Sequence, residues 1–428
     1  MLDINFISQN KDFVKRAVRE KGYDESLVEK VVQLNEKRKK LIGDVEKLRA
    51  ERNRITENIK DQVSKIKNTN EKFKLEEAKK KAQEIKKKLA EYEPELAKTE
   101  KELQEILFSI PNPAASDVVI GKSEKENEVL RTWGKIRKFD FTPKDHLELG
   151  KTLGILDFER GAKVAGAGFY YLKGDGVLLE MALINYGLDF LAKKGFTLVM
   201  TPDMARKRYY LGTGFTPKGP EAQTYTISES DLGLVATAEV TMAGYHADEV
   251  LEKKKLPLEY GGYSHCFRLE AGAYGKYSKG LYRVHQFGKV EMFIYSRPET
   301  SEEMHKRLLM LEEEFWQSLE IPYRVVKMCT ADLGAQASKK YDLEAFLPGR
   351  GEYGEITSSS NTTDYQARRL NIKFRDEERN VYVHTSNGTL VAIPRAIIAI
   401  LENFQEKDGS VKIPEVLQKY LGKKKING

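Results

Sequence analysis

The chain has 428 residues, enough for two or three domains with a sizeable core, and its net charge of +7 is compatible with a polyanionic partner without requiring one. Its two cysteines, Cys266 and Cys329, exclude a disulfide framework, and we expect no structural zinc site built from cysteine pairs. The start lacks the basic and apolar regions of a signal peptide, and no run reaches about 18 apolar residues, so we expect a cytoplasmic protein that does not cross a membrane.

The N-terminal region predicts a helical hairpin. After a helix around Lys11–Glu20, two long helices are expected between about residues 24 and 109. Apolar residues recur at alternating steps of four and three over 27–59 and again over 75–106, which is the pattern of helices that wrap around each other. The polar turn KNTNEK (67–72) should fold them back antiparallel, each about 50 Å long at about 1.5 Å per residue.

Two interpretations of this hairpin stay open. Heptads usually indicate dimerisation or a spacer, whereas cations along one helix can follow a phosphate backbone. The outer positions of the first helix carry such cations: Lys37, Lys39, Lys40, Lys47, Arg49, Arg54 and Lys60. Pro94 predicts a kink or a break in the second helix. The prolines of SIPNP (109–113) predict a boundary between a helical arm over 1–112 and a second domain over 113–428.

The next region predicts no dinucleotide-binding loop. GAGFYYLKGDG (166–176) is rich in glycine, but Tyr171 occupies the third glycine place of that fingerprint. A helix over 177–194 and a strand over 196–204 are expected to follow. Further along, Thr237 and Glu239 are expected to share one strand face, as ordinary surface or as part of a site.

A long antiparallel hairpin is predicted over 262–295. Two extended runs, Gly262–Glu270 and Leu281–Tyr295, are connected by the Gly-rich segment 271–280. One face of it is polar and aromatic: Ser264, Cys266, Arg268, Glu270, Arg283, His285, Phe287, Lys289 and Glu291. This face is either a solvated sheet face or a floor for an anionic aromatic ligand. A nucleoside triphosphate would use both the arginine forks and the ring.

The C-terminal part carries two more candidate sites. Glu355 and Ser358 offer oxygen ligands suited to magnesium, although a polar loop would look the same. Over 383–405, a β-prone run meets Pro394 and a helix is expected to begin. Arg395 then opposes the helix dipole, at a cost of several tenths of a kcal/mol, unless it and the helix end face one anion. The alternative is an exposed arginine that pairs with a surface carboxylate.

These stretches resemble the motifs of class II aminoacyl-tRNA synthetases, in the form found in seryl-tRNA synthetases. FRLEAGAYGKYSKGLYRVHQFGKVE (267–291) closely resembles motif 2, which would span about 262–295. The helix and strand over about 178–204 look like motif 1, and VHTSNGTLVAIPRAIIAILENFQ (383–405) resembles motif 3. Gly168 stands where the family usually has an arginine. The class I signatures HIGH and KMSKS are absent, as is GxxxxGK[ST].

The resemblance implies an α+β fold, with a mostly antiparallel sheet flanked by helices and an N-terminal antiparallel coiled-coil arm. It implies ATP-dependent activation of L-serine to seryl-adenylate and transfer to tRNA(Ser), and also to tRNA(Sec) where the organism has one. The arm would grip the tRNA, and motif 1 would build a homodimer. Two alternatives stay open. One is an amino acid:carrier-protein ligase, although such relatives lack the arm. The other is a non-catalytic tRNA-binding or scaffold protein with an inactive synthetase domain.

Matching motif positions also implies residue roles. The implied ATP contacts are Arg268 at the α-phosphate, Glu270 at the adenine edge, Phe287 stacked on adenine with Val284 beside it, and Arg283 and Arg395 at the outer phosphates. Arg268 and Arg395 would be the catalytic residues, and Glu355 and Ser358 would hold Mg²⁺. Serine would be surrounded by Thr237, Glu239, Glu291 and Thr389. Such a polar pocket rejects alanine strongly, whereas excluding the threonine methyl yields only about 1–3 kcal/mol.

Overall fold

The computed structural model describes residues 1–63, 69–215, 224–270 and 280–428. The chain divides into two compact units. The helical unit comprises Leu2–Arg19 and Tyr23–Ile110, and the sheet unit comprises Met1, Glu20–Gly22 and Pro111–Gly428. No helix among the described residues is long and apolar enough to cross a membrane.

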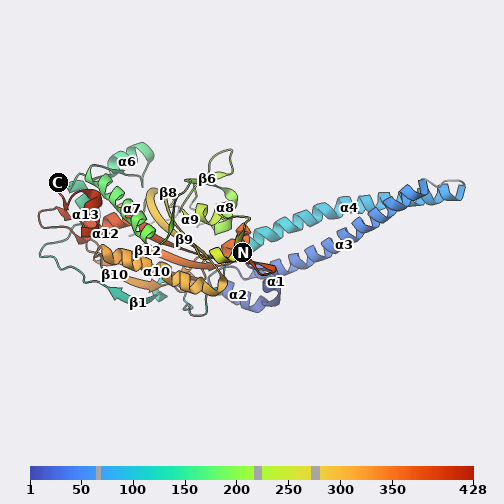
Figure 1. Cartoon of the computed structure of the whole chain (residues 1–428), viewed down its shortest axis with the longest axis horizontal. Coiled ribbons are helices and arrows are strands. Elements are labelled where there is room, and N and C mark those ends of the chain that lie inside the picture. Colours follow the sequence, from blue (N-terminus) through green and yellow to red (C-terminus); the bar gives the residue numbers. More distant parts are fainter. Residues whose placement is uncertain (64–68, 216–223, 271–279) are drawn as a thin grey trace. The chain divides into compact units, whose positions relative to one another are not determined.

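The helical unit is dominated by two long helices that lie side by side (Figure 1). Its helices are α1 (Ile4–Gln9), α2 (Lys11–Glu20), α3 (Ser26–Val63) and α4 (Thr69–Ser109). The predicted hairpin is therefore confirmed, and α2 has the predicted bounds. The break allowed for at Pro94 is absent, because α4 continues through that residue. The expected turn over 67–72 lies partly outside the described residues.

Apolar and charged contacts fix the register of α3 against α4. Val45 of α3 packs with Ile85 and Leu89 of α4 in a small buried cluster. Ion pairs connect the flanks of the two helices: Lys37–Glu95, Arg38–Glu100, Arg49–Glu93 and Glu51–Lys81. From Arg38–Glu100 through Arg49–Glu93 to Glu51–Lys81, the residue numbers rise along α3 and fall along α4, so the helices run antiparallel. Exposed pairs of this kind add roughly 0–1 kcal/mol each, so the apolar seam carries most of the stability.

The described part of the sheet unit is built around an eight-stranded sheet. The strand order is β1 (Glu128–Trp133), β10 (Tyr323–Lys327), β11 (Lys339–Leu347), β12 (Glu352–Thr363), β15 (His384–Ala392), β9 (Gln286–Ser296), β8 (Leu258–Phe267) and β4 (Thr197–Met200). All neighbouring pairs are antiparallel except β4 and β8, which are parallel. The predicted fold class is therefore confirmed.

The two faces of this sheet differ in what covers them. On β9, Val290, Met292 and Ile294 join the main apolar core together with α7 (Asp175–Lys193), α10 (Ser301–Ser318) and α12 (Ile393–Asn403). Phe293 and Tyr295 point to the opposite face, where α9 (Glu239–Gly244) and α11 (Tyr365–Leu370) complete a second core. Because side chains alternate along a strand, Lys289 and Glu291 share this second face.

Smaller elements complete the sheet unit. The remaining helices are α5 (His146–Thr152), α6 (Phe158–Ala165), α8 (Lys207–Thr213) and α13 (Glu415–Leu421), with short 3-10 turns at η1 (Glu124–Glu126), η2 (Lys253–Lys255), η3 (Gly280–Tyr282), η4 (Pro298–Thr300) and η5 (Thr330–Asp332). The remaining strands are β2 (Leu156–Asp157), β3 (Tyr171–Leu172), β5 (Met204–Arg206), β6 (Leu232–Leu234), β7 (Val250–Glu252), β13 (Lys373–Asp376), β14 (Arg379–Tyr382), β16 (Val411–Lys412) and β17 (Lys425–Ile426).

The predicted hairpin is present as β8 and β9, with Cys266 paired to Phe287 across the strands. The strands end sooner than predicted, however. Arg268 and Glu270 follow the end of β8, and residues 281–285 precede β9. Glu270 has a φ of 49°, which a regular strand does not allow. The connection over 271–279 lies outside the described residues.

A second strand prediction is wrong. Thr237 and Glu239 do not share a strand face, because α9 begins at Glu239 directly after β6 and a short bend. The Glu239 backbone N–H donates to Thr237 Oγ1 at 3.2 Å, which is the geometry of a hydroxyl near a helix start. The two side chains are nevertheless both buried.

Candidate active site

Arg395 and Glu355, two of the residues predicted to lie at the ATP phosphates, form an ion pair. Arg395 lies in the first turn of α12, directly after Pro394, and its Nη1 is 2.8 Å from Glu355 Oε1 on β12. Its guanidinium carbon also lies 4.9 Å from the centre of the Tyr282 ring. Desolvation acts to raise the pKa of Glu355, but Arg395 and then Lys340 outweigh it and hold the pKa at about 2. Glu355 is therefore ionised at neutral pH.

Arg268 and Arg283 lie at the same end of the hairpin, Arg268 directly after β8 and Arg283 shortly before β9. The guanidinium carbon of Arg268 lies 5.3 Å from the centre of the Phe287 ring, and its Nε donates to the Ala236 carbonyl at 3.3 Å. Arg283 Nε lies 3.4 Å from Glu270 Oε2. Below we call Arg268, Arg283 and Arg395, with Glu270 and Glu355, the arginine cluster. Val284 directly follows Arg283 in the sequence and is buried, but no described polar contact links Val284 to the arginine cluster.

Carboxylate and hydroxyl oxygens gather next to Glu355. Ser358 pairs across the sheet with Asp342 of β11, and Lys340 lies 3.4 Å from Asp342. Burial raises the pKa of Asp342 to about 7, against the opposing effect of Lys340. The described residues contain no group of three or more His, Cys, Asp or Glu side chains that could hold a metal. Mg²⁺ keeps several waters and takes phosphate oxygens, and Glu355 and Ser358 offer oxygen donors of the kind that it prefers.

A second group of polar side chains is buried on the same face of the sheet. Glu239 Oε1 accepts hydrogen bonds from Gln366 Nε2 at 2.7 Å and from Asn387 Nδ2 at 3.0 Å. Burial raises the pKa of Glu239 to about 7, and the nearby Glu291 carboxylate contributes to the same shift. Glu239 therefore exchanges a proton near neutral pH.

Glu291 and Thr389 complete this group. Thr389 Oγ1 on β15 donates to Glu291 Oε2 at 3.0 Å, and the Lys289 ammonium pairs with the same carboxylate and lies 3.3 Å from Thr389 Oγ1. All of these side chains are buried. At Lys289 and Glu291 this hairpin face is therefore buried and not solvated, whereas Arg283 of the same predicted face is exposed. We call the following residues the carboxylate cluster: Thr237, Glu239, Lys289, Glu291, Gln366, Asn387 and Thr389.

Arg268, a member of the arginine cluster, is close enough to act on carboxylates of both clusters. Its charge acts to lower the pKa of Glu239 on one side and of Glu355 on the other. A ligand that reaches both clusters would therefore pass this guanidinium. The geometry thus brings a buried set of polar side chains close to a set of arginines, which suits a small zwitterion together with a polyphosphate.

Several site residues have no role in the sequence-based prediction. The predicted residues are contacted directly by Lys289, Gln366, Asn387 and Tyr282. Asp342 pairs with Ser358 across the sheet, and Lys340 lies 3.4 Å from Asp342. Neutral amides and a lone tyrosine carry no spacing signal, so only tertiary pairing reveals them. Lys289 is the exception, because its place two residues before Glu291 on one strand face predicts a shared site.

Comparison with known families covers most of the chain. The model described as "Seryl-tRNA synthetase N-terminal domain" matches residues 1–114. The model described as "tRNA synthetase class II core domain (G, H, P, S and T)" matches residues 224–404 and so includes both clusters.

Full-length relatives and solved structures agree with these matches. Proteins named serine–tRNA ligase from Rubrobacter xylanophilus and Dictyoglomus thermophilum are 49% and 51% identical, over 100% and 99% of this chain and 99% and 98% of theirs. The crystal structure of seryl-tRNA synthetase from Pyrococcus horikoshii complexed with ATP is 43% identical and superposes with a TM-score of 0.91, over 100% of this chain and 99% of that one. A serine–tRNA ligase from Naegleria fowleri in complex with AMP is 32% identical, with a TM-score of 0.85 and the same coverage. The chain therefore belongs to the seryl-tRNA synthetase family.

Proposed function

We propose that this chain activates L-serine with ATP and transfers the seryl group to tRNA(Ser), and to tRNA(Sec) where the organism has one. The observation that carries the proposal is that the arginine cluster and the buried carboxylate cluster lie close enough for the Arg268 charge to act on a carboxylate in each, Glu355 and Glu239. The names of the full-length relatives, and the ATP in the Pyrococcus horikoshii structure, support the same chemistry.

In the first step, a serine carboxylate oxygen attacks the α-phosphorus of ATP. The bond from that phosphorus to the bridging oxygen of the β-phosphate breaks, and pyrophosphate leaves. Such a displacement needs positioning and charge neutralisation, and no protein nucleophile. Arg268 would bind the α-phosphate, with Arg283 and Arg395 on the outer phosphates. Glu270 would meet the adenine edge, and Phe287 would stack on the base with Val284 beside it.

Magnesium is part of this proposal. Glu355 and Ser358 would hold Mg²⁺, which neutralises phosphate charge when it is bound. Arg395 already pairs with Glu355, so the carboxylate is ionised and oriented before any phosphate arrives. Polyphosphate oxygens would then share Arg395 with Glu355.

The carboxylate cluster would bind serine. The ammonium group would meet Glu239 near Thr237, and the hydroxyl would lie between Glu291 and Thr389, whose mutual hydrogen bond marks the polar end of the pocket. Alanine would leave these buried groups without a partner, which is costly. Threonine would be excluded only because its extra methyl group lacks space.

In the second step, the terminal ribose hydroxyl of the tRNA attacks the carbonyl carbon of seryl-adenylate, and AMP leaves. We assign tRNA gripping to residues 1–112 and catalysis to residues 113–428. The match of the N-terminal family model and the cations along α3 support this division. A homodimer through residues 178–204 and a cytoplasmic location remain predictions.

The first experiment is ATP–pyrophosphate exchange with serine, threonine, alanine or glycine and without tRNA. Exchange with serine, and little or none with the other three, is expected. A protein that exchanges with none of them would support the non-catalytic alternative. A protein that exchanges with serine but charges no tRNA would leave a carrier protein as the acceptor.

The role of the helical unit is tested by removing residues 30–105 and closing the gap with a short flexible linker. Serine-dependent exchange should stay nearly intact, because neither cluster contains a residue of α3 or α4. Charging of tRNA(Ser) should fall by orders of magnitude. An equal loss in both reactions would mean that the arm acts only as structural support.

A further inference from the structure

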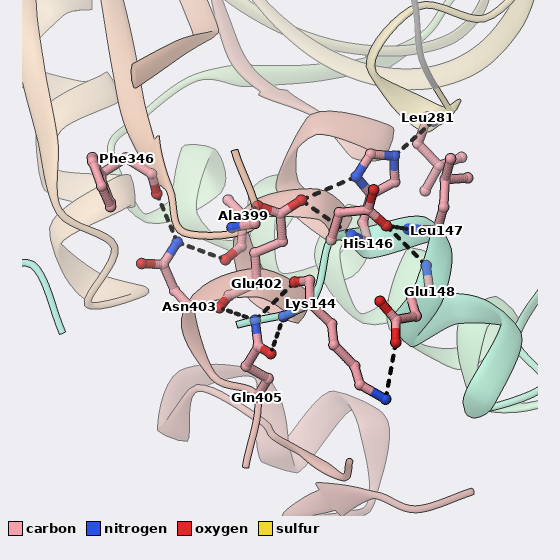
Figure 2. Close-up of polar contacts among 12 residues, drawn as sticks. Lys144, His146, Leu147, Glu148, Leu281, Phe346, Ala399, Glu402, Asn403 and Gln405 are labelled. Carbon is pink, nitrogen blue, oxygen red and sulfur yellow. Dashed lines mark hydrogen bonds and ion pairs between the residues drawn. The ribbon is translucent and has the colours of Figure 1, made fainter. Parts of the chain in front are cut away.

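A buried histidine–carboxylate pair lies outside both clusters (Figure 2). His146, the first residue of α5, and Glu402, near the end of α12, are 1% and 0% exposed. Glu402 Oε1 lies 3.0 Å from His146 Nδ1 and accepts the His146 backbone N–H at 3.1 Å. Glu402 Oε2 accepts the Gly349 N–H at 2.9 Å. The carboxylate is therefore well satisfied by three donors.

The far side of the His146 ring accepts a hydrogen bond. The backbone N–H of Leu281 donates to His146 Nε2 at 3.2 Å (Figure 2). A nitrogen that accepts cannot carry a proton, so the ring proton sits on Nδ1 and points at Glu402. The Glu402 carboxylate thus selects the tautomer that can bind Leu281, in the way that carboxylates orient histidines in other sites.

The residues around the His146–Glu402 pair are closely packed. A Cβ added at Gly280 would overlap His146 Nε2, and one at Gly349 would overlap the backbone of Asp145. Gln405 and Lys144 exchange two hydrogen bonds, Lys144 N–H to Gln405 Oε1 at 2.8 Å and Gln405 Nε2 to the Lys144 carbonyl at 3.0 Å. The segment before α5 is therefore held between the end of α12 and η3.

The elements joined by this pair also carry site residues. α12 carries Arg395 at its start and Glu402 two turns later. η3 carries Leu281 and Tyr282, and Arg283 follows it. The Tyr282 hydroxyl donates to the Glu355 carbonyl at 3.2 Å, and its ring packs against Arg395. η3 is thus attached to α12 through His146 and to the Arg395–Glu355 pair through Tyr282.

We propose that His146, oriented by Glu402, is a positioning residue for the triphosphate of ATP. It fixes η3 against α12, so that Arg283 and Arg395 keep the spacing that one polyphosphate requires. This inference rests on the function proposed above. No residue of the carboxylate cluster takes part in these contacts, so the pair acts on ATP and not on serine.

His146→Asn is the primary test. Asparagine retains a donor near the Nδ1 position for Glu402, but its side chain does not reach the Leu281 N–H. We expect the KM for ATP in pyrophosphate exchange to rise about tenfold while the KM for serine stays within twofold. His146→Gln places an acceptor near the Nε2 position and should recover part of the ATP affinity.

His246→Asn is the matched control. His246 also bridges a carboxylate and a second group, with Nδ1 2.7 Å from Glu249 Oε2 and Nε2 2.8 Å from the Tyr260 hydroxyl. It belongs to neither cluster, so both KM values should remain unchanged. If His146→Asn does not fold, Gly280→Ala displaces the same ring from the other side and should raise the KM for ATP alone.

Calorimetric binding of ATP to the wild type and the variants separates this inference from the proposed function. Tight ATP binding that weakens in His146→Asn supports the inference even if serine-dependent exchange fails. An unchanged ATP affinity in a folded His146→Asn protein overturns it. An equal rise in both KM values also overturns it, because that pattern indicates general loosening. A wild type that binds no ATP overturns both proposals.

Discussion

The carboxylate cluster and the arginine cluster lie on one sheet but are built differently. Glu239, Glu291 and Thr389 are at most 8% exposed and already bonded to neighbours. The Arg283 and Glu355 side chains are 40% and 37% exposed, and Arg283 and Arg395 each pair with a carboxylate. The first is a closed set of buried side chains bonded to one another, whereas the second is a set of charged pairs whose partners a polyphosphate would share under the proposed function. Selectivity therefore depends on packing at one end and on balanced charge at the other.

Arg268→Ala tests the connection between the clusters and should have the largest effect. Because Arg268 acts on both Glu239 and Glu355, both KM values should rise, and exchange should fall about a thousandfold. Steady-state exchange kinetics measure this. A rise confined to the KM for ATP would show that Arg268 acts only within the arginine cluster and does not connect it to the carboxylate cluster.

Arg395→Ala should separate the clusters. Arg395 contacts Glu355 and Tyr282 and no residue of the carboxylate cluster among the contacts described. Exchange should fall about a hundredfold, with a raised KM for ATP and unchanged serine binding by calorimetry. Glu355→Gln, which keeps the shape but removes the charge, is the companion variant. Weakened serine binding in Arg395→Ala would contradict the separation.

Serine binding should depend on pH through Glu239. The native pKa of about 7 lies above the ordinary value of 4.5, so the proton stabilises the fold at low pH and this stabilisation is lost as the pH rises through about 7. A bound ammonium group favours the ionised carboxylate. Serine should therefore bind about tenfold more tightly at pH 8 than at pH 6, with proton release at the lower pH. Calorimetry in two buffers measures both effects.

Glu239→Gln provides the control for that pH dependence. Glutamine keeps the shape and one acceptor but cannot titrate, so the pH dependence between pH 6 and pH 8 should disappear. An unaltered pH dependence in this variant would assign the proton to another group.

The smallest effect is expected from Gly168→Ala. Gly168 has a φ of 84°, and an added Cβ would overlap the His285 ring, whose Nδ1 lies 2.8 Å from the Arg268 carbonyl. Backbone strain and overlap together should cost about 1–3 kcal/mol of stability and raise the KM for ATP a few-fold. Gly166→Ala is the matched control, because Gly166 has a φ of 100° but nothing within 4 Å of its added Cβ. Equal losses in Gly168→Ala and Gly166→Ala would show that overlap with the His285 ring is not the cause.

The fold was predictable where the signal is long and periodic. The helical hairpin over 24–109 follows from sustained apolar steps, and the continuation through Pro94 shows that packing along a long helix can override a single proline. Predictions for short segments were less accurate. Thr237 and Glu239 were expected on a strand, but they lie where α9 begins. A segment of about four residues with mixed propensity does not distinguish a strand from the start of a helix.

The site was predictable only in part. The charged members of both clusters come from the motif resemblance, and their roles stay predictions. Gln366 and Asn387 are neutral and lie far from Glu239 in the sequence, so only the tertiary fold brings them to it, Gln366 from α11 and Asn387 from β15. The same holds for His146 and Glu402, which are 256 residues apart. Buried polar pairs of this kind leave no local periodicity.

The hydrogen bond from Thr389 to Glu291, with Lys289 attached to both, has an evolutionary consequence. Each of the three side chains is a partner of the other two, so a substitution at one leaves two buried polar groups without that partner. Single substitutions that would admit a different amino acid therefore pass through poorly stable intermediates. Lineages should conserve the three residues together or replace them together, and drift toward a neighbouring substrate is hindered without any proofreading step.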